Sequence, residues 1–416
     1  MNKTSLFTAA LTVASLQLAN APAWAQAAPA PAPAPAGAPA AGAAPAPAPA
    51  PETSPVSMPA MSGTLSGNVK PMKIDAGPLG GVYVTGVLSG IAMWQGNASP
   101  GDEDTQADVT NGQVVIQKVD GPFQFYAEGG AYSFPTVGTA YTRAGKTTGS
   151  TFGGLPVGFV KWAPNDSFSV QAGHLPTLIG AEYAFTFQNV NIERGLIWNQ
   201  ENIVARGVQA NYTKGPLALS FAWTDGFFSN RYSWLSGSAT YTFDSSNSLT
   251  VDAGGSVSTE TSGTSATPLL QNNSSIYNVY LSHTAGPLTI IPTLQYTTVP
   301  SDAVNRLTQG ALNKSLNTFG GGLYGIYTLD GGYSVAGRVE YISANGDRSD
   351  ATSLLYGGGS SAWSFTITPT WQNKFFFARA ELSYVKATSS APGVTFGETG
   401  NSTSQTRLLV ESGVIF

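Results

Sequence analysis

Short segments in which apolar and polar residues alternate recur from Leu79 to the end of the chain. Ser334–Ile342 and Phe376–Tyr384 show the pattern most clearly. Successive side chains of a β-strand point to opposite faces, so each segment predicts a strand with one apolar and one polar face. About sixteen such segments can be counted, each of roughly the 9–11 residues that a tilted strand needs to cross a bilayer.

The connections between these segments are of two kinds. Alternate ones are tight turns, such as Asp120-Gly121-Pro122 and Lys214-Gly215, whereas the intervening ones are mostly long, such as Pro135–Thr151 and Ser256–Ser274. Short turns at one end and long loops at the other are typical of an outer-membrane barrel, and a soluble β-sandwich has no reason to sort its loops in this way. The predicted fold is therefore all-β, a transmembrane antiparallel up-and-down β-barrel.

Two prolines, Pro292 and Pro369, lie inside predicted strands. Proline cannot donate a hydrogen bond to the neighbouring strand, so we expect a bulge or a register shift at each. The predicted strand number is therefore about sixteen, within a range of roughly fourteen to eighteen.

The composition agrees with such a barrel. Charged residues make up 10% and hydrophobic residues 42% of the 416 residues. A soluble domain has roughly 25% charged residues, so a secreted, soluble β-protein is the less favoured alternative. The absence of cysteine excludes a disulfide framework and a thiolate metal site. A net charge of −5 argues against a nucleic-acid partner, and the expected surroundings are the lipids of an outer membrane.

The N-terminal part of the chain predicts a signal peptide followed by a linker. Residues 1–25 resemble a secretory signal peptide, with Lys3, an apolar run and a cleavage site at Ala23-Trp24-Ala25. Residues 26–62 are rich in Ala and Pro and predict a disordered periplasmic linker, either a plain spacer or a segment that binds a periplasmic or cell-wall partner. The barrel is expected over residues 79–416.

The last predicted strand, Gln405–Phe416, alternates up to its terminal aromatic residue. It resembles the C-terminal sorting strand of Gram-negative outer-membrane barrels. The resemblance implies that Phe416 is recognised by the barrel-insertion machinery. The alternative is that a β-protein ends in Phe without such a role.

The barrel segment as a whole resembles the OmpL-like β-barrel porin family. The motifs that carry the resemblance are Gly80–Gly86, Gln113–Lys118, Ile179-Gly180-Ala181-Glu182, Asn191–Gly195 and Arg206-Gly207-Val208. The resemblance implies a passive channel for small hydrophilic solutes or ions in the outer membrane of a Gram-negative bacterium. It implies no cofactor and no catalytic residue.

The longest connection, Leu175–Glu201, is also the third long one. In sixteen-stranded porins the third loop folds into the barrel, so we expect this one to narrow the pore. Its candidate constriction residues are the charged and amide side chains Glu182, Asn189, Asn191, Glu193, Arg194 and Glu201. Charged groups at a constriction select ions by charge and hydration. The alternative is an exposed loop with solvated charges.

The pore wall has candidates of its own on the polar faces of predicted strands. These are Glu128, Arg338, Glu340, Arg379, Glu381, Arg407 and Glu411. Unpaired charges facing lipid would cost about 2–4 kcal/mol each, so these side chains are expected to face the lumen. Either the arginines face the acidic loop across the pore, or each pairs with its neighbouring glutamate on the wall.

Two other functions stay open at this point. A structural or adhesive barrel with a plugged lumen would suit the Ser/Thr-rich loops. A lipid-modifying enzyme would need a histidine beside a nucleophile, and His174 lies next to the third loop, but neither His174 nor His283 has an evident partner or metal-ligand spacing in the sequence. Sixteen-stranded porins are often homotrimers, and no stretch of the sequence identifies an interface.

Overall fold

The computed structural model describes residues 63–261, 263, 268–307, 314–350 and 356–416. The strands are β1 Met72–Asp75, β2 Gly81–Gly96, β3 Thr105–Lys118, β4 Phe123–Tyr132, β5 Val157–Asn165, β6 Phe168–Pro176, β7 Val204–Lys214, β8 Leu217–Thr224, β9 Trp234–Thr242, β10 Asn247–Ser256, β11 Ser275–Ala285, β12 Leu288–Val299, β13 Leu316–Thr328, β14 Tyr333–Ala344, β15 Ser361–Asn373, β16 Phe376–Thr388 and β17 Ser404–Ile415. The helices are short: η1 Gly77–Leu79, α2 Ala144–Ser150, η2 Thr186–Gln188, η3 Ile197–Gln200, α3 Leu269–Asn272, α4 Ser301–Leu307 and η4 Asp330–Gly332. Within the described residues, none of the helices is long and apolar enough to span a bilayer.

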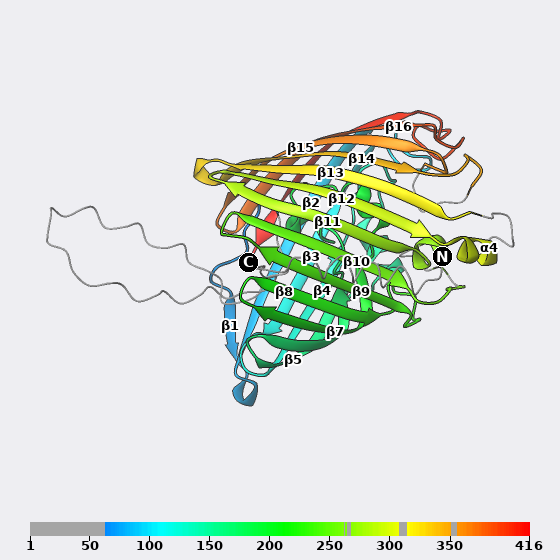
Figure 1. Cartoon of the computed structure of the whole chain (residues 1–416). Helices are drawn as coiled ribbons and strands as arrows, with labels where there is room; N and C mark the ends of the chain where they lie inside the picture. The colour runs from blue at the N-terminus through cyan, green and yellow to red at the C-terminus, as the bar shows by residue number, and fades with distance from the viewer. Residues whose placement is uncertain (1–62, 262, 264–267, 308–313, 351–355) are drawn as a thin grey trace, which may run out of the picture.

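Strands β2 to β17 form a closed antiparallel barrel of sixteen strands, as predicted. Each strand pairs with the next, β17 closes on β2, and Phe416 exchanges backbone hydrogen bonds of 2.9 and 2.8 Å with Gly86 at the seam. The short β1 pairs with the start of β2. Figure 1 shows the tilted wall, with α4 at one end of the barrel and β1 and the C-terminus at the other.

The two ends of the barrel differ as the sequence predicts. Connections at one end, here called the turn end, are tight turns such as 166–167, 215–216 and 374–375. Connections at the other, the loop end, are longer, and the longest is the third loop, residues 177–203 between β6 and β7.

The expectation of a bulge or register shift at the two internal prolines is wrong. Beside Pro292 the pairing of β11 with β12 lapses between Tyr280↔Thr293 and His283↔Ile290 and resumes in the same register. Pairing of β15 with β16 lapses in the same way at Pro369. Each proline omits a local hydrogen bond to one neighbour, and the long ladders on both sides keep the register.

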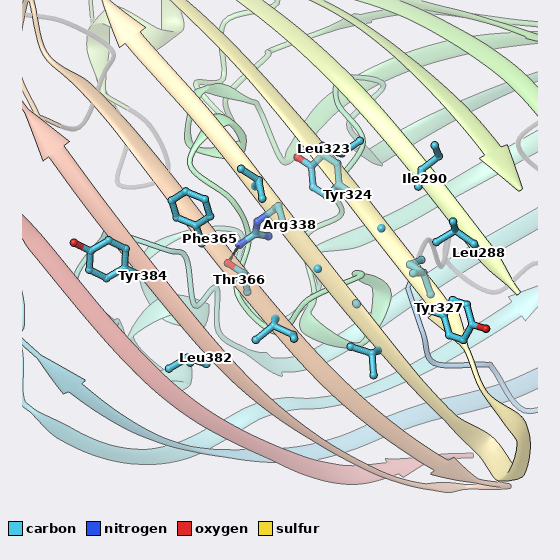
Figure 2. A pocket seen from close by; sticks show the side chains of 17 residues that line it. Leu288, Ile290, Leu323, Tyr324, Tyr327, Arg338, Phe365, Thr366, Leu382 and Tyr384 are labelled. Atoms are coloured by element: carbon cyan, nitrogen blue, oxygen red, sulfur yellow. Dashed lines mark hydrogen bonds between the residues drawn. The ribbon is translucent and has the colours of Figure 1, made fainter.

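Alternation places apolar side chains on the outer face and polar ones inside. Around β13–β16, Leu323, Phe365 and Leu382 are about half exposed on the outer face and line a shallow apolar groove. Arg338, on the alternate face of β14, is 1% exposed and points into the barrel toward Thr366 (Figure 2). This arrangement is the one expected of a wall with lipid on one side and a polar lumen on the other.

The predicted signal peptide (1–25) and Ala/Pro-rich linker (26–62) lie outside the described residues. The described chain begins at Gly63, ahead of β1.

Candidate functional site

The third loop folds into the barrel and lies against the inner wall. Its apolar residues give it a surface that packs there. Ile192 is fully buried against Ile91, Met93 and Leu409, which face inward from β2 and β17. Phe185 belongs to a second cluster with inward residues of β2, β3, β4 and β16. Burial of these side chains favours the inward position over an exposed loop.

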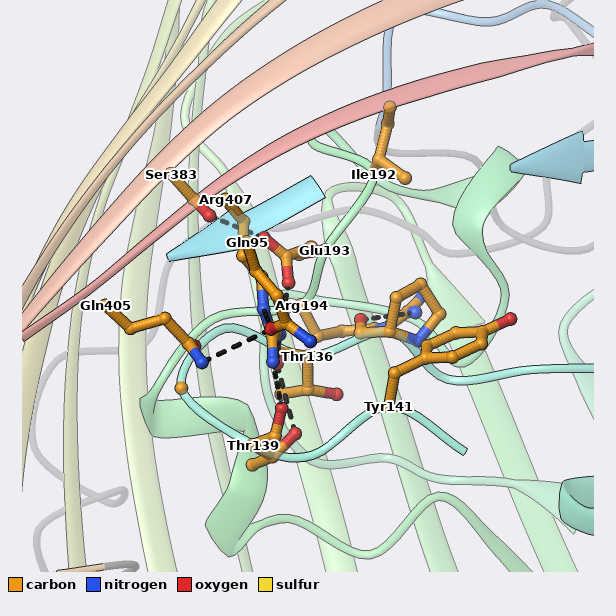
Figure 3. A network of polar contacts seen from close by, with 12 residues as sticks. Gln95, Thr136, Thr139, Tyr141, Ile192, Glu193, Arg194, Ser383, Gln405 and Arg407 are labelled. Atoms are coloured by element: carbon orange, nitrogen blue, oxygen red, sulfur yellow. Dashed lines mark hydrogen bonds and ion pairs between the residues drawn. The ribbon is translucent and has the colours of Figure 1, made fainter. Parts of the chain in front are cut away.

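Two wall arginines make ion pairs with the loop carboxylates. Arg338 Nη1 lies 2.7 Å from Glu182 Oε1 and donates to the Glu193 carbonyl oxygen at 2.8 Å. Arg407 Nη1 lies 2.7 Å from Glu193 Oε1 (Figure 3). All four side chains are at most 4% exposed. The opposite charges therefore meet in direct contact and not across a water-filled gap.

The third wall arginine binds the loop backbone. Arg379 donates to the carbonyl oxygens of Thr186 at 2.9 Å and Asn189 at 3.3 Å. Its Nε lies 3.1 Å from Glu411 Oε2 on the neighbouring strand, and Arg338 Nε lies 3.2 Å from Glu340 on its own strand. Arg338 and Arg379 thus pair with neighbouring glutamates on the wall, and all three arginines also contact the loop directly.

The wall glutamates accept hydrogen bonds from loop N–H groups. Glu340 accepts from Leu196 at 2.9 Å and from Ile197 at 3.4 Å. Glu381 accepts from Glu193 at 2.9 Å and from Ile192. A loop with little regular structure leaves its backbone donors without strand partners, and buried donors need acceptors. The carboxylates supply them as charge-assisted bonds.

The remaining predicted loop residues face different surroundings. Asn191 donates to Thr368 Oγ1 at 2.7 Å, while Asn189 binds backbone groups of its own loop. Arg194 is buried, donates to the Pro135 carbonyl oxygen at 2.7 Å and lies over the Trp198 ring. It therefore joins the third loop to the second, residues 133–156.

Glu128 and Glu201 lie away from the three wall arginines. Glu128 accepts from Gln113 at 3.0 Å and from the Tyr126 hydroxyl at 2.8 Å. Glu201, near the end of the third loop, accepts from Gln295 on β12 at 2.8 Å. Among the described residues no base forms an ion pair with either carboxylate.

The wall that carries Gln295 holds a continuous line of inward polar residues that we call the polar row. Strand register pairs its members one to the next: Ser169, Asn211, Ser220, Ser238, Asp252, Asn278 and Gln295. Asp252 is its only charged member, and it accepts from Asn278 at 3.0 Å and from the backbone N–H of Gly180 in the third loop at 3.3 Å.

Accessibility differs between the two sides of the lumen. Asn211, Ser220 and Ser238 of the polar row are partly exposed, whereas Ser364 and Ser383 on the arginine-bearing side are buried. Solvent therefore reaches the lumen wall at these three positions, whereas Ser169, Asp252, Asn278 and Gln295 of the row are buried. The polar row was not predicted, although Asp252 alternates with Leu249, Val251 and Ala253 as Arg338 does with its apolar neighbours.

The two histidines lie at opposite ends of the wall. His174 Nδ1 is 3.0 Å from the Leu155 carbonyl oxygen, and the ring packs on Phe228. His283 Nδ1 is 2.7 Å from Asn247 Oδ1 at the turn end. Among the described residues, no group of three or more acidic or histidine side chains is placed to hold a metal ion.

Comparison with known proteins gives one family and several solved folds. The family model described as "Putative beta-barrel porin-2, OmpL-like" matches residues 81–416. The fold is similar to outer-membrane expressed OmpT of Vibrio cholerae, with 12% identity, a TM-score of 0.53, and coverage of 83% of this chain and 100% of that one. It is also similar to the outer-membrane channel DcaP of Acinetobacter baumannii, with 11% identity, a TM-score of 0.52, and coverage of 81% and 97%. OmpF of Salmonella typhi gives 12% identity, a TM-score of 0.52, and coverage of 83% and 100%. A search of curated proteins found no match.

Proposed function

The chain belongs to the OmpL-like β-barrel porin family of the Gram-negative outer membrane, and from that premise we propose that its channel runs between the third loop and the polar row and favours small cations. The loop is the constriction in this proposal. Its outer side rests on the arginine-bearing wall, and its other side faces the row. The turn end then faces the periplasm and the loop end faces the exterior.

The proposed position of the channel rests on one observation, which is that three side chains of the polar row are more exposed than those of the arginine-bearing wall. Side chains that touch the channel must meet water. The polar row keeps partly exposed hydroxyl and amide groups at Asn211, Ser220 and Ser238, and the opposite wall is covered by the loop. Uncharged polar groups of this kind replace part of the hydration of a passing solute without binding it tightly.

The proposed charge preference follows from the balance of buried charges. The third loop and the inner wall bury eight carboxylates, those of Glu128, Glu182, Glu193, Glu201, Asp252, Glu340, Glu381 and Glu411. They bury four guanidinium groups, those of Arg194, Arg338, Arg379 and Arg407. One partly exposed lysine, Lys161, also lies on an inner face. The excess is negative, and a negative lumen concentrates cations.

Two of the carboxylates without a basic partner lie beside the proposed channel but beneath its exposed surface, since Glu201 is 7% and Asp252 is 1% exposed. Glu201 lies on the loop and Asp252 on the row, and Gly180 lies between them. The Gly180 N–H donates to Asp252, and a Cβ built at Gly180 would fall 2.0 Å from Glu201 Oε2. We assign the cation preference chiefly to this pair.

The proposal includes the remaining expectations for such a porin. Passage is passive and needs no catalytic group. Phe416 in the closing strand serves as the signal for barrel insertion, the barrel assembles as a homotrimer, and residues 1–25 and 26–62 act as signal peptide and periplasmic linker. The second candidate is a plugged barrel, which the extensive contacts between loop and wall favour.

Swelling of liposomes in neutral sugars of increasing size separates the two candidates. An open channel gives swelling rates that fall with sugar size, and empty liposomes and liposomes with heat-unfolded protein give the baseline. Folded protein that leaves even the smallest sugar excluded would contradict the porin proposal and support the plugged barrel.

A further inference from the structure

A segment that precedes the barrel in sequence lies inside its lumen. Thr64 Oγ1 donates to Thr370 Oγ1 at 3.1 Å. The Ser66 N–H donates to Gln372 Oε1 at 2.7 Å, and Gln372 Nε2 donates back to the Ser66 carbonyl oxygen at 2.8 Å. Thr370 lies on the inner face of β15, where buried Thr366 and Thr368 alternate with exposed Phe365 and Ile367. The lumen wall therefore binds this segment.

Leu65 anchors the segment in the apolar part of the lumen. Its side chain is 3% exposed and belongs to the cluster that contains Val87 of β2, Val115 of β3, Phe377 of β16 and Phe185 of the third loop. Burial of a leucine side chain among apolar neighbours stabilises this position. One leucine and the three hydrogen bonds hold the segment without a covalent link.

The direction of the segment follows from its partners. Gln372 is close to the turn 374–375, and Thr370 is farther along β15 toward the loop end. Ser66 contacts the first and Thr64 the second, so the chain enters at the turn end and its earlier residues lie deeper. Gly63 reaches the third loop, where a Cβ would fall 2.0 Å from the Asn189 carbonyl oxygen.

We infer that residues 63–66, held by Thr370, Gln372 and the Leu65 contacts, form a second constriction that limits the conductance and the solute size at the periplasmic end. The inference rests on the proposed function, since only an open channel can be narrowed. It assigns the size limit to two separate elements, the third loop near the middle of the barrel and this N-terminal segment below it. Leu65 and Thr64 are the residues that hold the segment in place.

Single-channel conductance of the full chain in planar bilayers tests the inference. Leu65→Asp places a charge in the apolar cluster and should expel the segment, with roughly a twofold rise in conductance and entry of larger sugars, because a wider passage conducts more. Leu79→Asp is the matched control, since Leu79 is 58% exposed outside the barrel wall. Heat-modifiable mobility on gels confirms that each variant is folded.

A reversible cross-link between the segment and β15 gives a second test. The chain has no cysteine, and the two γ-oxygens of Thr64 and Thr370 are 3.1 Å apart, so Thr64→Cys with Thr370→Cys should form a disulfide when an oxidant is added. In the Leu65→Asp background the oxidised pair should restore the wild-type conductance, and a reductant should raise it again.

The outcomes distinguish the inference from the function on which it rests. A conductance that rises in folded Leu65→Asp and falls back when the disulfide forms would support the inference. Failure of the disulfide to form, or unchanged conductance and size limit in folded Leu65→Asp, would overturn the inference and leave the porin intact. Absence of current in every folded variant would contradict the porin proposal itself.

Discussion

Arg338 Nη1 lies 2.7 Å from Glu182 Oε1 and joins strand β14 to the third loop across 156 residues of sequence. Neither side chain is more than 4% exposed. The same guanidinium contacts Glu340 on its own strand at 3.2 Å. One wall arginine therefore forms ion pairs with two carboxylates and fixes the position of the loop that we propose as the constriction.

Replacing Arg338 with Leu should strongly destabilise the barrel. The change leaves Glu182 and Glu340 buried without their base, and breaking a buried ion pair in this way costs about 3–5 kcal/mol. The free energy of unfolding in urea, followed by tryptophan fluorescence, measures the loss. Arg306→Leu is the control, because its pair with Asp302 is exposed and such pairs contribute about 0–1 kcal/mol. Equal losses in the two variants would show that Arg338 does not hold the loop.

Gly195→Ala should loosen the loop by a steric route. A Cβ at Gly195 would fall 2.0 Å from Glu340 Oε1, and Glu340 is the acceptor for the N–H of Leu196. Displacing the carboxylate should cost about 1–3 kcal/mol and add rapid fluctuations to the open-channel current. Gly149→Ala in α2 is the control, since its Cβ would have no atom within 4 Å. An open-channel current without added fluctuations, together with unchanged stability in Gly195→Ala, would contradict the predicted role of Glu340 in holding the loop.

Variants with a single cysteine should show on which side of the third loop ions pass. The natural chain has none, so Ser238→Cys on the polar row and Ser364→Cys on the opposite wall each introduce one thiol. A cationic thiol reagent should reduce the current through Ser238→Cys and leave Ser364→Cys unchanged, because Ser238 is partly exposed and Ser364 is 0% exposed. The reverse pattern would place the channel on the arginine-bearing side.

Asp252→Asn and Glu201→Gln should each lower the preference for cations. A unit charge about 6 Å from a passing ion in water contributes about 0.7 kcal/mol, which is roughly a threefold change in the permeability ratio. The double variant should lose more than either single one. Glu398→Gln removes an exposed carboxylate at the loop end and serves as the control. A double variant as selective as the wild type would contradict our assignment of the preference to this pair.

Alternation and loop sorting were sufficient to predict the barrel. Period-two patterns such as Phe376–Tyr384 determine which side chains face inward, and β16 has Arg379 and Glu381 buried and Leu382 exposed, as expected. The prolines were misjudged because sequence alone does not show that long ladders on both sides of Pro292 and Pro369 hold the register.

The partners of the inward charges could not be predicted from sequence. Arg338 and Glu182 are far apart in the chain, and their contact depends on the path of a loop with little secondary structure. The same holds for Leu65, whose apolar partners come from several strands and the loop. The inward position of Asp252, by contrast, is predictable from sequence, because it alternates with apolar neighbours on β10.

The reversal potential of single wild-type channels under a potassium chloride gradient tests the central claim most directly. We predict discrete current steps and a reversal potential displaced toward the potassium equilibrium potential, since the lumen has an excess of carboxylates over basic groups. A reversal potential displaced toward the chloride equilibrium potential would contradict the account of the lumen charge. A folded barrel without current steps would contradict the proposal that the barrel is an open channel.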